Sequence, residues 1–173
     1  MMLQKLQNGG EEKMGSKSKI LAGSAIYAAL YATLVFVLAP ISYREIQLRI
    51  ADALLGLVPL MGWAGIVGHS VGVFISNIPS PLGAIDILNA IPSFIFAWLV
   101  WKLRKISVFL GLTIYSIALG LSVGWTLHYA FNIPLQITIA YASIGIFLST
   151  AVGGYILYKT VKKLKILQRW FGE

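Results

Sequence analysis

The sequence predicts an all-α integral membrane protein, a bundle of six transmembrane helices with both termini in the cytoplasm. Hydrophobic residues make up 58% of the 173 residues and charged residues 12%, whereas a soluble domain carries about 25% charged residues. Mean hydropathy is +0.80. Six spans of about 20 residues with short loops use up this length, which leaves no room for a separate soluble domain. We therefore expect a multi-pass protein of the cell membrane.

The basic residues give the orientation. Twelve of the fourteen Lys and Arg residues lie in three clusters, before Ile20, within 102–105 and after Tyr158. Basic residues that flank spans stay on the cytoplasmic side. If all three clusters are inside, an even number of spans separates each from the next. The net charge of +8 then reports orientation, and no nucleic-acid partner is expected, because the cations flank spans and do not line a folded face.

The predicted elements follow the apolar runs. Residues 1–19 form a polar cytoplasmic tail, 20–158 the six-helix membrane domain, and 159–173 a basic amphipathic cytoplasmic tail. We predict the spans at 20–39, 51–60, 63–78, 85–101, 106–129 and 135–158, separated by proline, glycine and charged turns. The second and third spans share barely 28 residues, 51–78. Such short spans often mark a binding site, and the alternative is a tilted or partly re-entrant hairpin without one.

Small residues recur at helix-packing spacing in three spans. The first span contains Ala25, Ala28, Ala29 and Ala32, the third Gly68 and Gly72, and the fifth Gly120 and Gly124. In lipid, small residues let two helix backbones approach closely. Two interpretations stay open: packing inside the bundle, or docking of a partner membrane protein, for which the first span is the best candidate.

Strongly polar residues gather at the predicted outer ends of the spans. Arg49 and Asp52 are spaced i, i+3, and Asp86, Asn89 and Ser93 are spaced i, i+3, i+7, so each set shares a helix face. An ionisable group in an apolar helix is costly and marks function by default. Carboxylates and amides around one outward cavity suit a flat polar heterocycle. The candidate substrate-binding residues are Gln47, Arg49, Asp52, Asn77, Asp86 and Asn89.

Structural roles compete with this interpretation. Arg49 is also spaced to form an ion pair with Asp52 or with Glu45. Tyr43 and Trp125 bring aromatic surface to the same level, where interfacial aromatic residues are also common. The spacing alone does not decide between these roles.

No pattern in the sequence indicates catalysis, a metal site or a cofactor. The chain lacks the HExxH, G-x-S-x-G and P-loop motifs and contains no cysteine. His69 and His128 are predicted at opposite membrane sides, so they cannot share a metal ion. We expect no enzymatic activity, and transport would need an ATPase on another chain.

Two stretches carry a family resemblance. Residues 45–54 read EIQLRIADAL and lead to Leu57-Val58-Pro59, which resembles the I-Q-x-R-[IV]-[SA]-[ED]-A-L…L-x-P signature of the QueT family. The glycines of the third span, then Ser76-Asn77 and PLGAID at 81–86, are similar to that family's G-x-x-x-G…A-N…G-x-x-D-[IV] stretch. The resemblance is close over 44–92. The sequence departs from the family at Asp52, where Glu is usual, at Ser76, and at Asn89-Ala90, where Gly-Ser is more common.

The resemblance implies a function and partners. QueT proteins are substrate-binding S components of energy-coupling factor (ECF) transporters. The fold implied is a six-helix bundle with an externally accessible site, and the partners are a membrane coupling protein and two cytoplasmic ATPases. The implied substrate is a queuosine precursor, a 7-deazaguanine such as preQ0, preQ1 or queuine. Asp52 and Asp86 are then candidate acceptors for the base edge, and the alanines of the first span are candidates for docking the coupling protein.

Two other functions stay open at this point. The chain could be an S component for another vitamin-like compound, with the same fold and a different pocket. It could also be a small structural or assembly protein of the membrane, in which the outer polar residues only hold helices together. Binding of a ligand by the purified protein separates the first two functions from the third.

Overall fold

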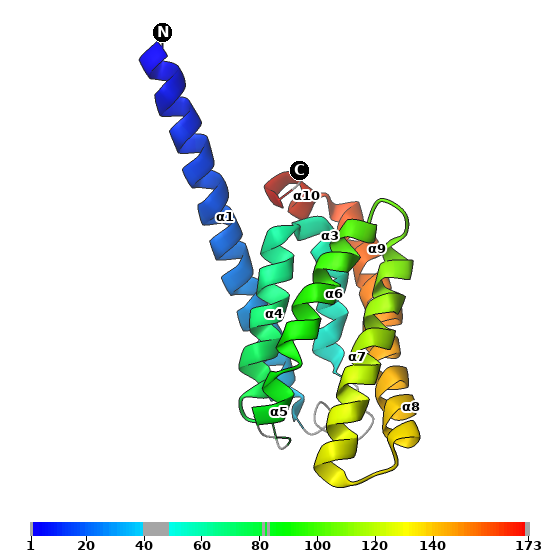
Figure 1. The fold of residues 1–173 in the computed structure, drawn as a ribbon. Coiled ribbons are helices and arrows are strands. Elements are labelled where there is room, and N and C mark those ends of the chain that lie inside the picture. Colours follow the sequence, from blue (N-terminus) through cyan, green and yellow to red (C-terminus); the bar gives the residue numbers. More distant parts are fainter. Residues whose placement is uncertain (1, 40–48, 81, 83, 172–173) are drawn as a thin grey trace.

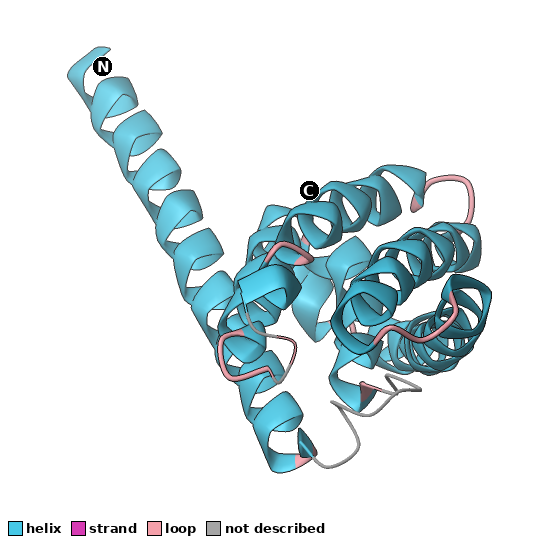
Figure 2. Ribbon diagram, turned by 60° about the horizontal axis from the view of Figure 1, so that its bottom comes forward, coloured by secondary structure: helices cyan, strands magenta, loops and turns pink. Residues whose placement is uncertain are grey.

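The computed structural model describes residues 2–39, 49–80, 82 and 84–171, which form helices and turns and no strands (Figure 2). The elements are α1 (Met2–Val37), η1 (Ile50–Leu57), α3 (Val58–Met61), α4 (Trp63–Asn77), α5 (Ala84–Ile87), α6 (Ala90–Leu103), α7 (Val108–Phe131), α8 (Leu135–Ile146), η2 (Phe147–Gly153), α9 (Gly154–Leu164) and α10 (Ile166–Phe171). Here η1 is a 3₁₀ helix and η2 a π-helix. The predicted all-α class is confirmed.

Four helical stretches are long and apolar enough to cross a membrane: Lys17–Val37, Ile85–Leu103, Val108–Phe131 and Leu135–Leu164. They correspond to the predicted spans one, four, five and six. Large apolar side chains on them face outward, among them Ile26 (70% exposed) and Ile156 (61% exposed), as expected for surfaces in contact with lipid. A multi-pass membrane protein is therefore confirmed.

The predicted second and third spans are short. Ile50–Met61 is a short apolar helical stretch, and α4 has 15 residues. Gly62 makes the turn between them at φ 58°, a left-handed conformation that glycine adopts without strain. A full crossing needs about 20 helical residues, so the count of six spans stays a prediction, as does the cytoplasmic location of the termini.

The basic clusters and the polar residues lie at opposite ends of the bundle. Figure 1 shows both chain ends and the α6–α7 turn at one end, with α5 and the α7–α8 turn at the other. The α6–α7 turn and the chain ends carry the clustered Lys and Arg residues, whereas Asn77 and Asp86 belong to α4 and α5. The segregation expected from the sequence is thus present in the fold.

Glycines let α1 approach α4. A Cβ atom at Gly68 would lie 2.7 Å from Tyr27 Cβ, and one at Gly72 would lie 2.8 Å from Tyr31 Cβ. Gly124 makes a similar contact between α7 and α8, because a Cβ atom there would lie 2.6 Å from Ile139 Cα. For these glycines, packing inside the bundle is the interpretation that holds.

Two irregular elements place residues at the bundle interior. η1 packs closely against α9 at Gly56. A Cβ atom at this position would overlap the backbone carbonyl of Gly154. Asp52 belongs to the same element, η1. The predicted fourth span is interrupted, since α5 ends at Ile87 and α6 begins at Ala90. Asp86 and Asn89 border this interruption, and both are buried.

Both terminal segments contain helix in the structure. α1 begins at Met2, so the helix includes most of the segment predicted as a separate polar tail. At the other end, α9 continues to Leu164, Lys165 adopts φ 54°, and α10 forms a separate short helix. Phe171 of α10 packs against Gly23 of α1. The segment predicted as a basic amphipathic tail therefore contains the end of α9 and the whole of α10, which packs against the bundle.

Candidate binding site

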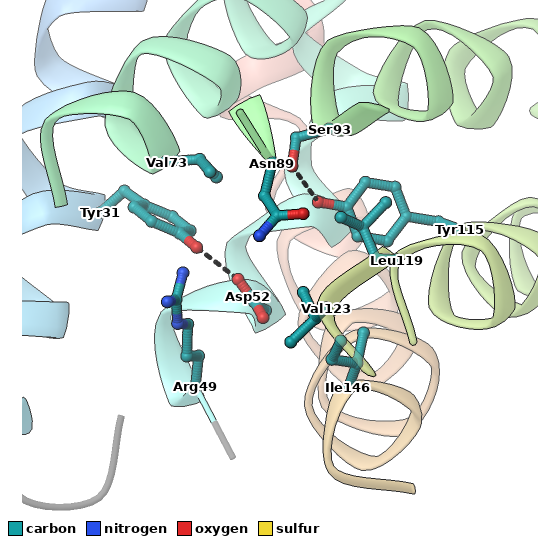
Figure 3. Close-up of a pocket in the computed structure, with 10 residues that line it drawn as sticks. All are labelled: Tyr31, Arg49, Asp52, Val73, Asn89, Ser93, Tyr115, Leu119, Val123 and Ile146. Atoms are coloured by element: carbon teal, nitrogen blue, oxygen red, sulfur yellow. Dashed lines mark hydrogen bonds between the residues drawn. The ribbon is translucent and has the colours of Figure 1, made fainter. Parts of the chain in front are cut away.

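A small cavity lies among α1, η1, α4, α6, α7 and α8 (Figure 3). Its polar lining consists of Tyr31, Arg49, Asp52, Asn89, Ser93 and Tyr115, and its apolar lining of Val73, Leu119, Val123 and Ile146. Figure 3 shows the side chains of Tyr31, Arg49, Asp52 and Asn89 directed toward one another across it. Charged and amide groups thus face apolar walls and two aromatic rings.

Arg49 joins three helical segments. Its Nη2 atom lies 3.2 Å from Asp86 Oδ2, and its Nη1 atom donates to Asn77 Oδ1 at 2.8 Å. Asn77 in turn donates from Nδ2 to the backbone carbonyl of Asp86 at 2.8 Å. The guanidinium is therefore held by α4 and α5, and the ion pair is buried, with side-chain exposures of 8% and 1%.

Each carboxylate oxygen of Asp86 is bonded by another protein side chain. Its Oδ2 atom pairs with Arg49, and its Oδ1 atom accepts from Asn89 Nδ2 at 2.9 Å. Asp86 is 1% exposed and is not among the residues that line the cavity. The role of Asp86 as an acceptor for a substrate edge stays a prediction, and it would require this buried carboxylate to become accessible from the cavity.

Asp52 has the opposite environment. It lines the cavity, and its Oδ1 atom accepts a hydrogen bond from the Tyr31 hydroxyl. Within the described part of the chain, its Oδ2 atom has no hydrogen-bond partner. Asp52 is therefore the carboxylate that can accept from a ligand in this cavity, and Tyr31 fixes its orientation.

Asn89 connects the cavity to α7. Its Oδ1 atom accepts from Ser122 Oγ at 2.7 Å, while Nδ2 donates to Asp86. Ser93, one turn further along α6, accepts from the Tyr115 hydroxyl at 3.3 Å. The predicted stripe of Asp86, Asn89 and Ser93 thus faces the bundle interior, and its last two members line the cavity.

The six predicted site residues separate into three groups. Arg49, Asp52 and Asn89 line the cavity. Asn77 and Asp86 do not line it and instead bond the Arg49 guanidinium. Gln47, like Glu45 and Tyr43, lies outside the described residues. Arg49 does form an ion pair, and the partner recorded in the structure is Asp86.

A chain of buried hydrogen bonds, which the sequence pattern did not indicate, lies next to the cavity. The Tyr27 hydroxyl lies 3.2 Å from His69 Nδ1, and His69 Nε2 lies 2.8 Å from the Tyr115 hydroxyl. Tyr31 packs edge-on against the His69 imidazole, with ring centroids 5.3 Å apart. One available signal was Tyr27 and Tyr31 at i, i+4 in a span without charges, because buried tyrosine hydroxyls need polar partners.

Other polar and aromatic residues near the predicted outer end do not line the cavity. Trp125 and Tyr129 stack on each other with centroids 6.0 Å apart and are 54% and 67% exposed. His128 Nδ1 lies 2.6 Å from the carbonyl of Ile133, in the turn that ends α7. For Trp125, the interfacial interpretation fits its exposure.

The predicted docking alanines also separate. Ala28 and Ala32 are 4% and 6% exposed, whereas Ala25 and Ala29 are exposed. The two pairs lie on different faces of α1, because each pair is spaced i, i+4 and the pairs are offset by three residues. Only Ala25 and Ala29 are available to a partner.

Comparison with known proteins identifies the family. The sequence profile of the family described as QueT transporter matches residues 21–163, most of the chain. No curated protein and no solved structure gives a significant match. The profile includes every residue that lines the cavity. The chain therefore belongs to the QueT transporter family and is a component of a membrane transporter.

Proposed function

We propose that the chain is the substrate-binding S component of an ECF transporter and that it captures a queuosine precursor, a 7-deazaguanine such as preQ0, preQ1 or queuine. The observation that carries this proposal is the environment of Asp52. Its carboxylate faces an apolar-walled cavity, beside Arg49 and Asn89, with one oxygen that no described residue occupies.

This environment matches the edge of a deazaguanine. The base presents adjacent N–H donors, one on the ring and one on the exocyclic amine, which a carboxylate accepts. Its carbonyl accepts from a donor such as Arg49. The base plane packs between apolar side chains such as Leu119 and Val123 and the ring of Tyr115. A base without these donors would leave Asp52 desolvated and unpaired. The site would therefore bind such a base more weakly than a deazaguanine.

Binding requires the cavity to enlarge. Its volume is about 20 Å³, on a scale where one water needs about 10–15 Å³. A bicyclic base enters only if side chains around the cavity move apart. Tyr31 and Arg49 are the polar groups whose hydrogen bonds would have to shift, so part of the binding free energy is spent on this rearrangement.

The energy for transport would come from partner chains. The S component docks on a membrane coupling protein, which carries two cytoplasmic ATPases. The exposed stripe of Ala25 and Ala29 on α1 supports docking there, with Ile26 (70% exposed) and Leu30 (46% exposed) beside it. Small residues allow close approach of a partner helix in lipid.

A thermal-shift screen of the detergent-purified protein tests the substrate. A ligand at about 100 times its dissociation constant stabilises the folded state by about 2.7 kcal/mol, which for a chain of this size raises Tm by about 5–10 °C. We expect this shift with 7-deazaguanines, a shift with guanine as well because it carries the same donors on this edge, and little shift with riboflavin, thiamine or biotin. A shift with a vitamin instead would reassign the substrate, and no shift with any compound would favour a structural role for the polar residues.

A further inference from the structure

We propose that the basic end of the bundle holds a binding site for the phosphate group of an anionic phospholipid, in an open groove between the start of α7 and α9. The groove has a volume of about 770 Å³, within the range of small-molecule sites. In Figure 1 these two segments lie beside each other at the end of the bundle that carries the α6–α7 turn. The cavity that contains Asp52 is a separate feature with no lining residue in common.

The lysines in the groove are held in place by aromatic rings. Tyr155 and Tyr158 stack with centroids 6.3 Å apart and planes inclined by 21°. Lys159 Nζ lies 4.7 Å from the Tyr155 centroid, and Lys162 Nζ lies 5.3 Å from the Tyr158 centroid. An ammonium over an aromatic face is attracted to it. The two charges therefore lie along a stacked pair of rings that also lines the groove.

Among the residues that line the groove, Lys159, Lys162 and Lys163 are cationic and none is acidic. Among the acidic side chains that the structure describes, Asp52 and Asp86 are buried around the other cavity. The groove therefore presents an excess of positive charge that an anion can neutralise.

The start of α7 adds further anion-binding groups. α7 begins at Val108, and Ser107 at its N-cap accepts from Leu110 N at 3.2 Å. The hydroxyl hydrogen of Ser107 is donated to no residue that the structure describes. The positive end of the α7 helix dipole is directed to the same place. Ser107 can therefore donate to a phosphate oxygen that the lysines attract.

The position of the groove selects a lipid as the source of the phosphate. Val108 starts one candidate membrane span, and Lys159, Lys162 and Lys163 lie near the end of another, Leu135–Leu164. The groove is thus at the level of the lipid headgroups. Ile106 is 76% exposed and Leu110 45% exposed beside it, which gives acyl chains an apolar contact that a free anion cannot use. Basic pockets between spans bind anionic headgroups in this way.

Native mass spectrometry of the purified chain, titrated with phosphatidylglycerol or phosphatidylcholine, tests the site. The Lys159→Gln/Lys162→Gln variant removes the two ring-held charges, and Lys17→Gln/Lys19→Gln removes two charges at the same end, outside the groove. Each lysine near an anionic headgroup contributes about fivefold in affinity, so the groove variant should bind phosphatidylglycerol about 30-fold more weakly. The control variant should bind it nearly as tightly as the unchanged chain, and phosphatidylcholine should bind weakly to all three.

Three results would overturn the proposal. Equal losses in the two variants would mean a general attraction of surface charge and no groove site. Unchanged phosphatidylglycerol binding in the groove variant would exclude the lysines from any lipid site. Displacement of the lipid by inorganic phosphate at equal phosphate concentration would assign the groove to a soluble anion. All four lysines are exposed, so the variants should fold, and deazaguanine affinity is measured separately to confirm this.

Discussion

Asp52 and Asp86 are chemically alike and belong to one polar cluster, but their neighbours give them different roles. Asp86 is enclosed by Arg49 and Asn89, each of which bonds one of its carboxylate oxygens. Asp52 has one oxygen bonded by Tyr31 and one toward the cavity. We therefore propose that Asp86 supports Arg49 and that Asp52 is the carboxylate that contacts a ligand.

Asp86→Asn should lower stability more than Asp52→Asn does. The change leaves the Arg49 guanidinium buried beside a neutral amide, and loss of one partner of a buried pair costs about 3–5 kcal/mol. Asp52→Asn is the matched control, because its amide oxygen can still accept from Tyr31. Thermal unfolding of both variants in detergent, without ligand, measures the difference. Equal stabilities would mean that the Arg49–Asp86 pair contributes little to folding.

The sequence predicted part of this site. Asn89 was identifiable because polar groups in an apolar helix are costly, and Arg49 and Asp52 because their i, i+3 spacing places them on one helix face. All three line the cavity. The sequence did not show that Asp86 pairs with Arg49 while Asp52 faces the cavity, because this depends on which helix end lies next to the Arg49 side chain. Tyr31 and Tyr115 were missed, since a tyrosine in a membrane span is also an ordinary packing or interfacial residue.

At the scale of elements, the close contact of α1 with α4 brings Tyr31 to the cavity. Gly68 and Gly72 lie under Tyr27 and Tyr31, and no side chain fits between the helices there. The spacing of small residues predicted a close contact but not its partner. Ala28 and Ala32 are buried, which fits packing inside the bundle, and the exposed Ala25 and Ala29 are the alanines that we propose for docking.

Gly68→Ala should destabilise the bundle. The added Cβ would lie 2.7 Å from Tyr27 Cβ and 2.9 Å from the Ser24 carbonyl oxygen, and overpacking of this kind costs about 1–3 kcal/mol. Gly15→Ala is the control, because a Cβ atom there has no neighbour within 4 Å. Thermal unfolding in detergent measures both. A Gly68→Ala protein as stable as the control would show that α1 shifts away from α4 at little cost.

Bulky residues on the exposed stripe of α1 should block assembly without affecting capture. Ala25→Leu/Ala29→Leu enlarges two side chains that face away from the bundle. We expect the coupling protein and ATPases to be lost from co-purification of a tagged chain, while deazaguanine affinity stays unchanged. Ala140→Leu on α8, another exposed alanine, is the control. Normal co-purification of the Ala25→Leu/Ala29→Leu chain would place the docking surface elsewhere.

Across the whole molecule, the basic clusters and the buried polar residues lie toward opposite ends of one bundle. The basic clusters at the chain ends and the α6–α7 turn mark one end, and Asn77 and Asp86 are carried by α4 and α5 toward the other (Figure 1). Composition and charge were enough to predict this polarity, because both follow from the cost of charge in lipid. The irregular elements η1 and η2 were not predictable, since their geometry depends on tertiary contacts such as Gly56 with Gly154.

The orientation can be measured with single cysteines, because the chain has none of its own. Lys105→Cys and Gln136→Cys place exposed thiols in the α6–α7 turn and at the start of α8. An impermeant maleimide on intact cells should label the cysteine at 136 and leave the one at 105 unlabelled until the membrane is opened. Ser80, between the predicted third and fourth spans, is 7% exposed and is a poorer reporter. The opposite labelling pattern would reverse the predicted topology.

Calorimetric titration of the unchanged chain and of Asp52→Asn measures whether Asp52 accepts a hydrogen bond from the ligand. Each protein is titrated with a 7-deazaguanine and with its analogue that lacks the exocyclic amine. If the amine donates to Asp52, the unchanged chain should bind the analogue about 10- to 150-fold more weakly, the value of one hydrogen bond to a charged group. The Asp52→Asn protein should bind both ligands weakly and hardly distinguish them. No measurable binding by the unchanged chain, or the same ratio of affinities in both proteins, would contradict the account.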